Sequence, residues 1–298
     1  MALDNWDEIR TAYQVARRGT VSGAAEALGV HHATVIRHVD ALEARLGVKL
    51  FQRHARGYTS TEAGTDLFGV AQATEDQFTQ LVSRIRGRGE AVSGDLVLTS
   101  LPGMAKLLTP VLADFQAEHP DVIIRYLTDT RVFRLEYGEA HVAIRAGNVP
   151  QEPDNVVQPF YRQHMALYAH RDYLEKHGVP GDDEALKSHY FVGSDFEDSR
   201  APFDIWMREN IAREQVIYRT AGVEAGYCAV KQGVGIGFLP MWLAKRDPDL
   251  VEVMPSREEW VGPSWIVTHV DLHRTPKVQT FLAFLKERAK EWPCANAR

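Results

Sequence analysis

Hydrophobic residues recur every three or four positions between residues 31 and 50, which predicts an amphipathic helix. Four of them fall on one face, at spacings of four, three and four: Val35, Val39, Leu42 and Leu46. The preceding segment, residues 20–28, contains mostly small residues and is followed by Gly29, which can end a helix with a positive φ angle. Two helices joined by a short glycine-containing turn form the unit whose second helix enters the DNA major groove.

Shorter elements are expected on both sides of this helix pair. A first helix is predicted from an inner face that ends before Gly19 and comprises Ile9, Ala12, Tyr13 and Ala16. Residues 47–61 form a segment short enough for a two-stranded wing. Its arginines, Arg53 and Arg56, are well placed for DNA phosphates.

A long polar helix is predicted to begin at Thr61 and Glu62. Its inner positions alternate at spacings of three and four, close to a heptad repeat: Leu67, Val70, Ala71, Thr74, Phe78, Leu81 and Ile85. Because the sequence provides no nearby core for so narrow a stripe, we expect this helix to pair with its twin in a second chain. The alternative is a helix that lies on its own domain. Three glycines within residues 86–94 then indicate a hinge.

Short strands alternate with helices beyond the hinge. The first unit has strands at 95–100, 122–127 and 141–145 and a helix at 104–118. The second has strands at 165–169, 190–192, 216–218 and 236–239, a helix around Trp206 and another at 223–232. A strand at 265–270 returns the chain to the first unit, and a helix at 278–289 closes it. The near-continuous apolar strands predict parallel sheets covered on both faces.

Several motifs in the chain resemble those of one known family. In the first ninety residues they are Ala24-Ala25-x-x-Leu28, Thr34-Val35-x-Arg37, Leu42-Glu43-x-x-Leu46-Gly47, Leu50-Phe51-x-Arg53 and Thr61-x-x-Gly64. In this order and at these spacings they resemble the winged helix-turn-helix of LysR-type transcriptional regulators. The resemblance continues more weakly through Leu108-x-Pro110-x-Leu112-x-x-Phe115, Leu135-x-x-Gly138 and Val230-x-x-Gly233-Val-Gly235-Ile-Gly-x-x-Pro240.

Three positions depart from the family pattern. His31 stands where the family usually has a capping Ser, and Ile36 stands where it usually has another Ser near the phosphates. His141 replaces the Asp that the family usually has before its Ile, which would change the local hydrogen bonds.

The resemblance implies an α/β fold class with three parts. Residues 1–60 are expected to form a winged helix-turn-helix DNA-binding domain, and residues 61–90 a dimerising linker helix and hinge. Residues 91–298 are expected to form a two-lobed effector domain similar to periplasmic binding proteins. Lobe I would comprise residues 91–163 and 268–298, and lobe II residues 164–267. The resemblance also implies a homodimer, arranged as a homotetramer, that contacts promoter DNA and RNA polymerase.

The start of the second helix is expected to read DNA bases. Arg37 could match two acceptors of guanine, and a small methyl-bearing side chain could meet thymine. The alternative is that these are ordinary solvated positions. The DNA-binding candidates are His31, His32, Ala33, Thr34, Arg37, His38, Arg53 and Arg56.

A small effector is expected between the lobes, because ligands of open α/β sheets bind beyond the carboxyl ends of strands. The candidates are Thr99, Ser100, Leu101, Thr128 and Arg145 in lobe I, with Ser194 and Thr220 facing them from lobe II. Together with the helix N-terminus after Ser100, this set would suit a small anion such as a carboxylate. The alternatives are that Thr128 closes a turn and that Arg145 pairs with a carboxylate of its own lobe.

Charge and composition change this picture only slightly. The net charge is -6, but residues 1–60 hold eight Lys+Arg against six Asp+Glu, so the remainder carries -8. That direction suits a DNA-facing N-terminal part. Only two cysteines occur, Cys228 and Cys294, which indicates a reducing compartment. With neither a secretory signal nor a long apolar run, a cytoplasmic location is expected.

Other kinds of chemistry find little support. Gly233-Val-Gly235-Ile-Gly237 follows a helix and precedes a strand, the reverse of a dinucleotide fingerprint. We expect no cofactor, no zinc site and no convergent catalytic set. Cys228 is expected to pack inside its helix rather than to sense redox state. The alternatives to a ligand-responsive regulator are a solute-binding protein with an added helical domain and an enzyme that uses the cleft.

Overall fold

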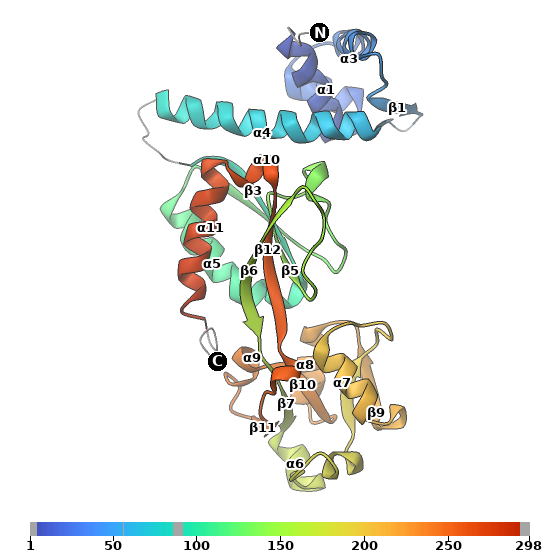
Figure 1. The fold of residues 1–298 in the computed structure, drawn as a ribbon, viewed down its shortest axis with the longest axis vertical. Coiled ribbons are helices and arrows are strands. Elements are labelled where there is room, and N and C mark those ends of the chain that lie inside the picture. The colour runs from blue at the N-terminus through green and yellow to red at the C-terminus, as the bar shows by residue number, and fades with distance from the viewer. Residues whose placement is uncertain (1–4, 56, 86–91, 293–298) are drawn as a thin grey trace.

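The computed structural model describes residues 5–55, 57–85 and 92–292. Figure 1 shows three parts stacked along the longest axis, with the N-terminal module at one end and a two-lobed body below it. The module contains α1 (Trp6–Arg18), α2 (Val21–Leu28), α3 (His32–Leu46), β1 (Phe51–His54) and β2 (Gly57–Ser60). The long helix α4 (Glu62–Ile85) crosses between the module and the body.

The predicted hydrophobic stripe forms the core of the N-terminal module. Val35, Val39 and Leu42 are fully buried, and they pack against residues of α1 and α2 that include Val15 and Ala24. The antiparallel pair β1 and β2 forms the predicted wing. The helix-turn-helix and wing expected from the sequence are therefore present.

The Thr61-x-x-Gly64 motif joins the wing to α4. Thr61 Oγ1 accepts a hydrogen bond from the Gly64 backbone and donates one to the Lys49 carbonyl. A Cβ atom on Gly64 would lie 2.0 Å from the carbonyl oxygen of Leu50. Only glycine allows α4 to begin this close to the preceding strand.

The hydrophobic stripe of α4 divides between two environments. Leu67 packs against the core of the N-terminal module, and Ala71 is buried. Val70, Phe78, Leu81 and Ile85 remain exposed in this single chain. Leu67 and Ala71 therefore face their own module, as in the alternative interpretation, whereas Val70 and the apolar residues of the second half of α4 stay largely exposed.

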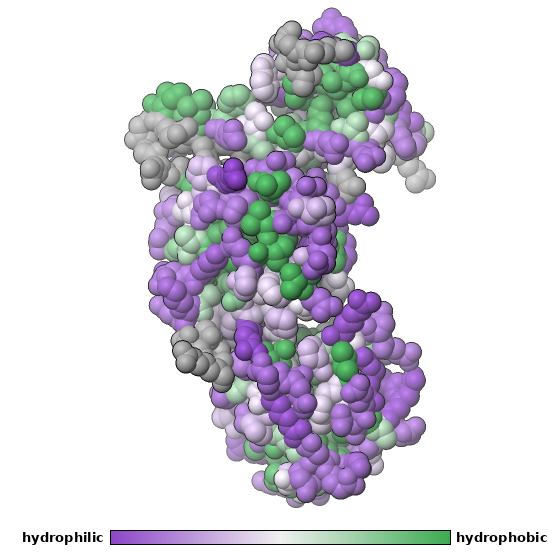
Figure 2. Space-filling view, in the orientation of Figure 1, coloured by the Kyte–Doolittle hydropathy of each residue, from purple (hydrophilic) through white to green (hydrophobic). Residues whose placement is uncertain are grey.

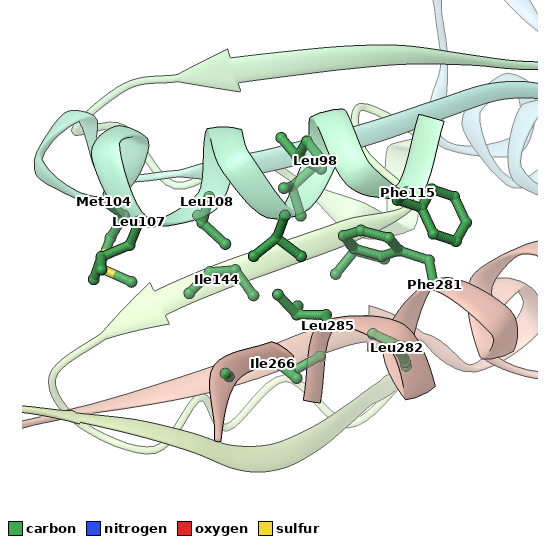
Figure 3. Packing of buried hydrophobic residues seen from close by; sticks show 14 of the residues in the cluster. Leu98, Met104, Leu107, Leu108, Phe115, Ile144, Ile266, Phe281, Leu282 and Leu285 are labelled. Carbon is green, nitrogen blue, oxygen red and sulfur yellow. The ribbon is translucent and has the colours of Figure 1, made fainter. Parts of the chain in front are cut away.

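The upper lobe of the body is a five-stranded sheet in the order β4-β3-β5-β12-β6. Its strands are β3 (Gly94–Ser100), β4 (Val122–Thr128), β5 (Val142–Ala146), β6 (Asn155–Gln163) and β12 (Gly262–His269). Its helices are η1 (Pro102–Met104), α5 (Ala105–Glu118), η2 (Leu135–Tyr137), α10 (Val270–His273) and α11 (Pro276–Ala289). Figure 3 shows α5 and α11 packing on one side of this sheet, with Phe115 facing Phe281.

The lower lobe is a second five-stranded sheet in the order β11-β7-β10-β8-β9. Its strands are β7 (Met165–His170), β8 (Phe191–Ser194), β9 (Val216–Thr220), β10 (Ile236–Pro240) and β11 (Leu250–Met254). Its helices are α6 (Arg171–His177), η3 (Ala185–Ser188), α7 (Pro202–Asn210), η4 (Arg213–Gln215), α8 (Val223–Lys231), α9 (Met241–Ala244) and η5 (Glu258–Trp260). Trp206, Phe238 and Trp260 pack edge to face in its core.

The prediction of wholly parallel sheets is wrong, because both sheets are mixed. β12 runs antiparallel to β5 and β6, and β7 runs antiparallel to β10 and β11. Each antiparallel strand lies next to one of the two places where the chain crosses between lobes, near residues 164 and 261. The expected division at residue 267 falls inside β12, which begins at Gly262.

Candidate nucleic-acid interface and effector site

The first two turns of α3 present an exposed face opposite the buried stripe. His31, His32, Ala33 and Arg37 are exposed, and Thr34 is half-buried. Within the described residues, no ion pair engages the guanidinium of Arg37. This face therefore offers an uncommitted guanidinium beside small side chains, the combination that can read base edges in the major groove.

His31 caps the recognition helix with its ring. The backbone of His31 is extended (φ −76°, ψ 148°), and its Nδ1 accepts a hydrogen bond of 3.2 Å from the backbone N–H of Ala33. A neutral ring that accepts at Nδ1 carries its proton on Nε2. His31 thus caps the helix in place of the Ser that the family usually has, and its ring keeps the Nε2–H group, which can donate to a phosphate.

His38 of α3 contacts the first helix of the module, α1. Its Nδ1 is 2.9 Å from Thr11 Oγ1, which itself donates to the carbonyl of Asp7 at 2.6 Å. Because the Thr11 hydroxyl donates its proton to the Asp7 carbonyl, it accepts a hydrogen bond from Nδ1–H of the His38 ring. His38 is thereby held against α1, and only its Nε2 edge is left for another contact.

The wing arginine Arg53 is engaged by carboxylates of α3. Its guanidinium contacts Asp40 at 2.5 Å and Glu43 at 3.2 Å, and it lies over the ring of Tyr58. The hydrogen bond to Asp40 raises the pKa of Arg53. A DNA phosphate at this position would have to share Arg53 with these carboxylates. Arg56, the other wing candidate, lies outside the described residues.

The lobe I candidates gather at the carboxyl ends of adjacent strands. Ser100 of β3 lies in register with Thr128 of β4, as the sequence predicts for strand ends. Thr99 and Ser100 are nevertheless buried, whereas Leu101 and Thr128 are exposed. The exposed part of this group therefore consists of the Leu101 and Thr128 side chains.

Ser100 is tied to a tyrosine that sequence reasoning did not select. Its Oγ lies 2.7 Å from the hydroxyl of Tyr126 and 2.9 Å from the carbonyl oxygen of Leu101. Burial raises the pKa of Tyr126, so this hydroxyl keeps its proton. The only available signal was the position of Tyr126, two residues before Thr128 on the same strand.

Arg145 follows the alternative interpretation. Its guanidinium contacts Glu152 at 3.2 Å and donates to the carbonyl of Phe133 at 2.9 Å, so it pairs within its own lobe. The Arg145 side chain keeps 15% of its surface exposed. An anionic effector at this point would compete with Glu152 for the guanidinium.

The lobe II candidates form a matching pair. Ser194 of β8 lies in register with Thr220 of β9, and each hydroxyl accepts a backbone N–H of the turn that follows its strand. The nearby start of α8 contacts lobe I. Lys106 Nζ lies 2.9–3.0 Å from both carboxylate oxygens of Glu224, and Gly103 packs against Val223. Sequence reasoning missed this ion pair because its members are 118 residues apart.

His141, the third departure from the family pattern, joins lobe I to α4. The ring is buried, Nδ1 accepts the backbone N–H of Val97 at 2.7 Å, and Nε2 lies 3.4 Å from the amide of Gln72. Imidazole supplies two opposed polar atoms here, which lets one side chain reach both β3 and the long helix.

An apolar groove runs between α1 and α4. Its volume is about 1140 Å³, and its lining includes Trp6, Ile9, Val70, Phe78 and Val82. Figure 2 shows hydrophobic residues gathered on the visible face of this module. Phe78 is 53% exposed and Trp6 is 60% exposed, so the described residues leave a large part of this hydrophobic surface uncovered.

Two further observations bear on other functions. The glycine-rich segment after α8 precedes β10, as expected, and does not open a helix in the manner of a nucleotide site. Across residues 5–55, 57–85 and 92–292, no cluster of His, Cys, Asp or Glu could hold a metal ion, and no helix is long and apolar enough to span a membrane. Cys228 is exposed, so the prediction of a packing cysteine is wrong; its helix turns this position to solvent.

Comparison with known proteins agrees with the geometry. Residues 6–65 match the family model "Bacterial regulatory helix-turn-helix protein, lysR family", and residues 89–290 match the "LysR substrate binding domain". The chain is 30% identical over 252 residues to the regulator IlvY of Escherichia coli, covering 82% of this chain and 84% of IlvY.

Solved structures show the same architecture. The LysR-type regulator CrgA of Neisseria meningitidis is 26% identical, with a TM-score of 0.57 and coverage of 95% of this chain and 98% of CrgA. ArgP of Mycobacterium tuberculosis, 18% identical, shares the fold with a TM-score of 0.73 and coverage of 97% and 98%. The chain therefore belongs to the LysR family of transcriptional regulators and is not an enzyme.

Proposed function

We propose that the protein binds promoter DNA sequence-specifically through the exposed start of α3. The observation that carries this proposal is the uncommitted guanidinium of Arg37 on a helix whose opposite face is fully buried. Arg37 would read a guanine, Ala33 and Thr34 would meet neighbouring bases, and His31 would donate to a phosphate. His32, His38, Arg53 and Arg56 complete the proposed interface.

The protein is proposed to act as a homodimer that assembles into a homotetramer. Phe78 lines the groove between α1 and α4, and Leu81 and Ile85 are exposed farther along α4; a twin α4 would cover these side chains. A two-fold pair of recognition helices would then meet an imperfect palindrome. RNA polymerase is the proposed protein partner at the promoter, and the cytoplasm is the proposed location.

The proposed functions of the three parts follow the sequence prediction: residues 1–60 bind DNA, residues 61–90 dimerise and residues 91–298 bind a small effector. The effector would lie between the lobes, near Thr128 and Leu101 of lobe I and Ser194 and Thr220 of lobe II. Thr99 and Ser100 are buried beneath this position, and Ser100 would act on the effector through its contact with Tyr126. Arg145 would favour an anionic effector.

Effector binding is proposed to change lobe closure and, through it, the spacing of paired DNA-binding modules. The effector needs only to bind one arrangement better than the other. Lys106 and Glu224 join the lobes in the present arrangement, so this contact would have to break or tighten when the lobes move.

A mobility-shift experiment tests the proposal. Purified full-length protein is titrated against the DNA upstream of its own gene and against a random duplex of equal length, at fixed salt. We expect a specific complex on the upstream DNA that survives excess random duplex. A monomeric protein that binds both duplexes equally at low salt would contradict the proposal.

A further inference from the structure

Lobe II contains a cavity that is lined by its own residues. The cavity has a volume of about 370 Å³ and lies between α7 and β9, beneath the turn that follows β8. Figure 1 shows α7 and β9 at the right-hand side of the lower lobe. Its lining comes from residues 194–219 alone, and Met207, Ile211 and Val216 supply its apolar part. It is therefore separate from the proposed interlobe effector position, although Ser194 borders both.

Two guanidinium groups at this cavity are held by backbone carbonyls. Arg208 donates to the carbonyl of Ser199 at 2.7 Å, and Arg219 donates to the carbonyl of Arg213 at 3.0 Å. A carbonyl fixes a guanidinium without neutralising its charge, and each group keeps further N–H donors. Among the described residues, neither Arg208 nor Arg219 is joined to a carboxylate by an ion pair.

The three acidic residues of the cavity lining differ in their contacts. Glu197 is paired with Arg213 at 2.8 Å, so these two offset each other. Burial raises the pKa of Asp204, and the hydrogen bond from Ser199 and the nearby Arg208 offset part of that effect. Asp195 at the rim is the remaining carboxylate. Arg208 and Arg219 are therefore the guanidinium groups of the lining that keep N–H donors for a further acceptor.

We propose that this cavity is a second ligand site, specific for a small organic acid. The carboxylate of the ligand would bind Arg208 and Arg219, since a guanidinium fork matches a carboxylate. Its apolar body would lie against Met207, Ile211 and Val216. The apolar wall favours an organic acid over inorganic phosphate, which could use only the arginines. Because the turn after Ser194 lines the cavity, a ligand here would also order a segment that borders the proposed interlobe position.

Fluorine NMR of para-fluorobenzoate with the full-length protein tests this site. The probe carries one carboxylate on an apolar ring, and weak binding broadens its signal. We expect broadening with the unmodified protein. Arg208→Gln and Arg219→Gln are each expected to weaken binding roughly tenfold, the scale of one charge-assisted hydrogen bond. Both side chains are exposed, so the variants should fold, which circular dichroism would verify.

Arg171→Gln is the matched control. Arg171 also donates to a backbone carbonyl, that of Pro248, and lies outside the cavity. This variant is expected to keep the broadening. Inorganic phosphate at the same concentration as para-fluorobenzoate is expected to displace little of this probe. Absence of broadening, or equal broadening with Arg208→Gln and Arg219→Gln, would overturn the site. Full displacement by phosphate would overturn the organic-acid class. None of these results depends on whether DNA or an interlobe effector binds.

Discussion

The guanidinium of Arg17, in the last turn of α1, lies 3.4 Å from the carboxylate of Asp95 near the start of β3. The same guanidinium reaches Glu75 of α4 at 3.3 Å. β3 then runs to Ser100, at the edge of the proposed effector position. The start of β3 therefore contacts the DNA-binding module, and the end of the same strand carries proposed effector residues.

We predict a measurable but small coupling between Arg17 and Asp95. Both side chains are about one-third exposed, so solvent screens their attraction. A double-mutant cycle with Arg17→Ala and Asp95→Ala should give a coupling free energy of unfolding of about 0.2–1 kcal/mol that falls as salt rises. Pairing Arg17→Ala with Asp114→Ala, whose carboxylate instead faces Arg288, should give additive effects. Additivity in both cycles would show that the contact contributes nothing.

Arg37→Ala should weaken specific DNA binding by about 1–3 kcal/mol, because it removes a two-acceptor contact to a base. Fluorescence anisotropy at one salt concentration, on operator and on random duplex, measures the change in discrimination. Arg18→Ala is the control, since Arg18 is an exposed arginine of α1. Its removal should affect both duplexes alike. Unchanged discrimination in Arg37→Ala would remove Arg37 from the base-reading set.

The sequence predicted the elements with strong periodicity. The stripe of Val35, Val39 and Leu42 is fully buried, as its helical spacing required. β6 was missed because it is largely half-buried and contains Pro159, so it shows no clean alternation. The antiparallel direction of β12 could not be predicted, because strand direction depends on where the chain crosses between lobes rather than on the residues of the strand.

Candidate site residues were predicted by type, but their partners were not. Ser100 and Arg145 stand at strand ends as expected, yet Tyr126 engages one and Glu152 the other. Arg53 is likewise held by Asp40. Each of these contacts joins separate elements, and a single sequence carries no record of which elements meet.

His31→Ala should lower the free energy of unfolding by about 0.5–2 kcal/mol, because the backbone N–H of Ala33 loses its acceptor. His31→Ser should restore the cap and leave the protein at least as stable as the original. Urea unfolding of the three proteins gives this order. Equal stability of the Ala and His forms would show that the ring does not act as a cap.

Phe78→Asp should shift the proposed homodimer toward monomer. The ring of Phe78 packs edge to face on Trp6, with centroids 6.2 Å apart, and both rings would be buried by a second α4. A buried, unpaired carboxylate there would be strongly unfavourable. Sedimentation velocity measures the change. Gln77→Asp places the same charge on an exposed neighbouring position of α4 and should leave the dimer intact. A Phe78→Asp protein that stays dimeric would place the dimer contact elsewhere.

Glu43 fixes the relation between α3 and the wing. Its carboxylate is almost fully buried and accepts hydrogen bonds from the backbone N–H groups of Leu50 and Phe51. It also pairs with Lys49 at 2.6 Å. Burial alone raises the pKa of Glu43, but the hydrogen bonds from Lys49, Leu50 and Phe51 outweigh it, so the pKa lies below its ordinary value.

The pH dependence of the N-terminal module follows from that direction. Because the folded-state pKa of Glu43 is lower than the unfolded one, its contribution is fully present above about pH 4.5 and is lost as pH falls through the folded pKa. Glu43→Gln should cost about 1–3 kcal/mol at neutral pH, since the amide cannot replace the charged contacts. The same variant should show less loss of stability on acidification than the original protein. Asp40→Asn, which changes an exposed carboxylate beside the same Arg53, should have a smaller effect at neutral pH. Thermal unfolding from pH 7 to pH 3 measures both quantities, and parallel acid profiles for Glu43→Gln and the original protein would show that Glu43 does not cause the acid sensitivity.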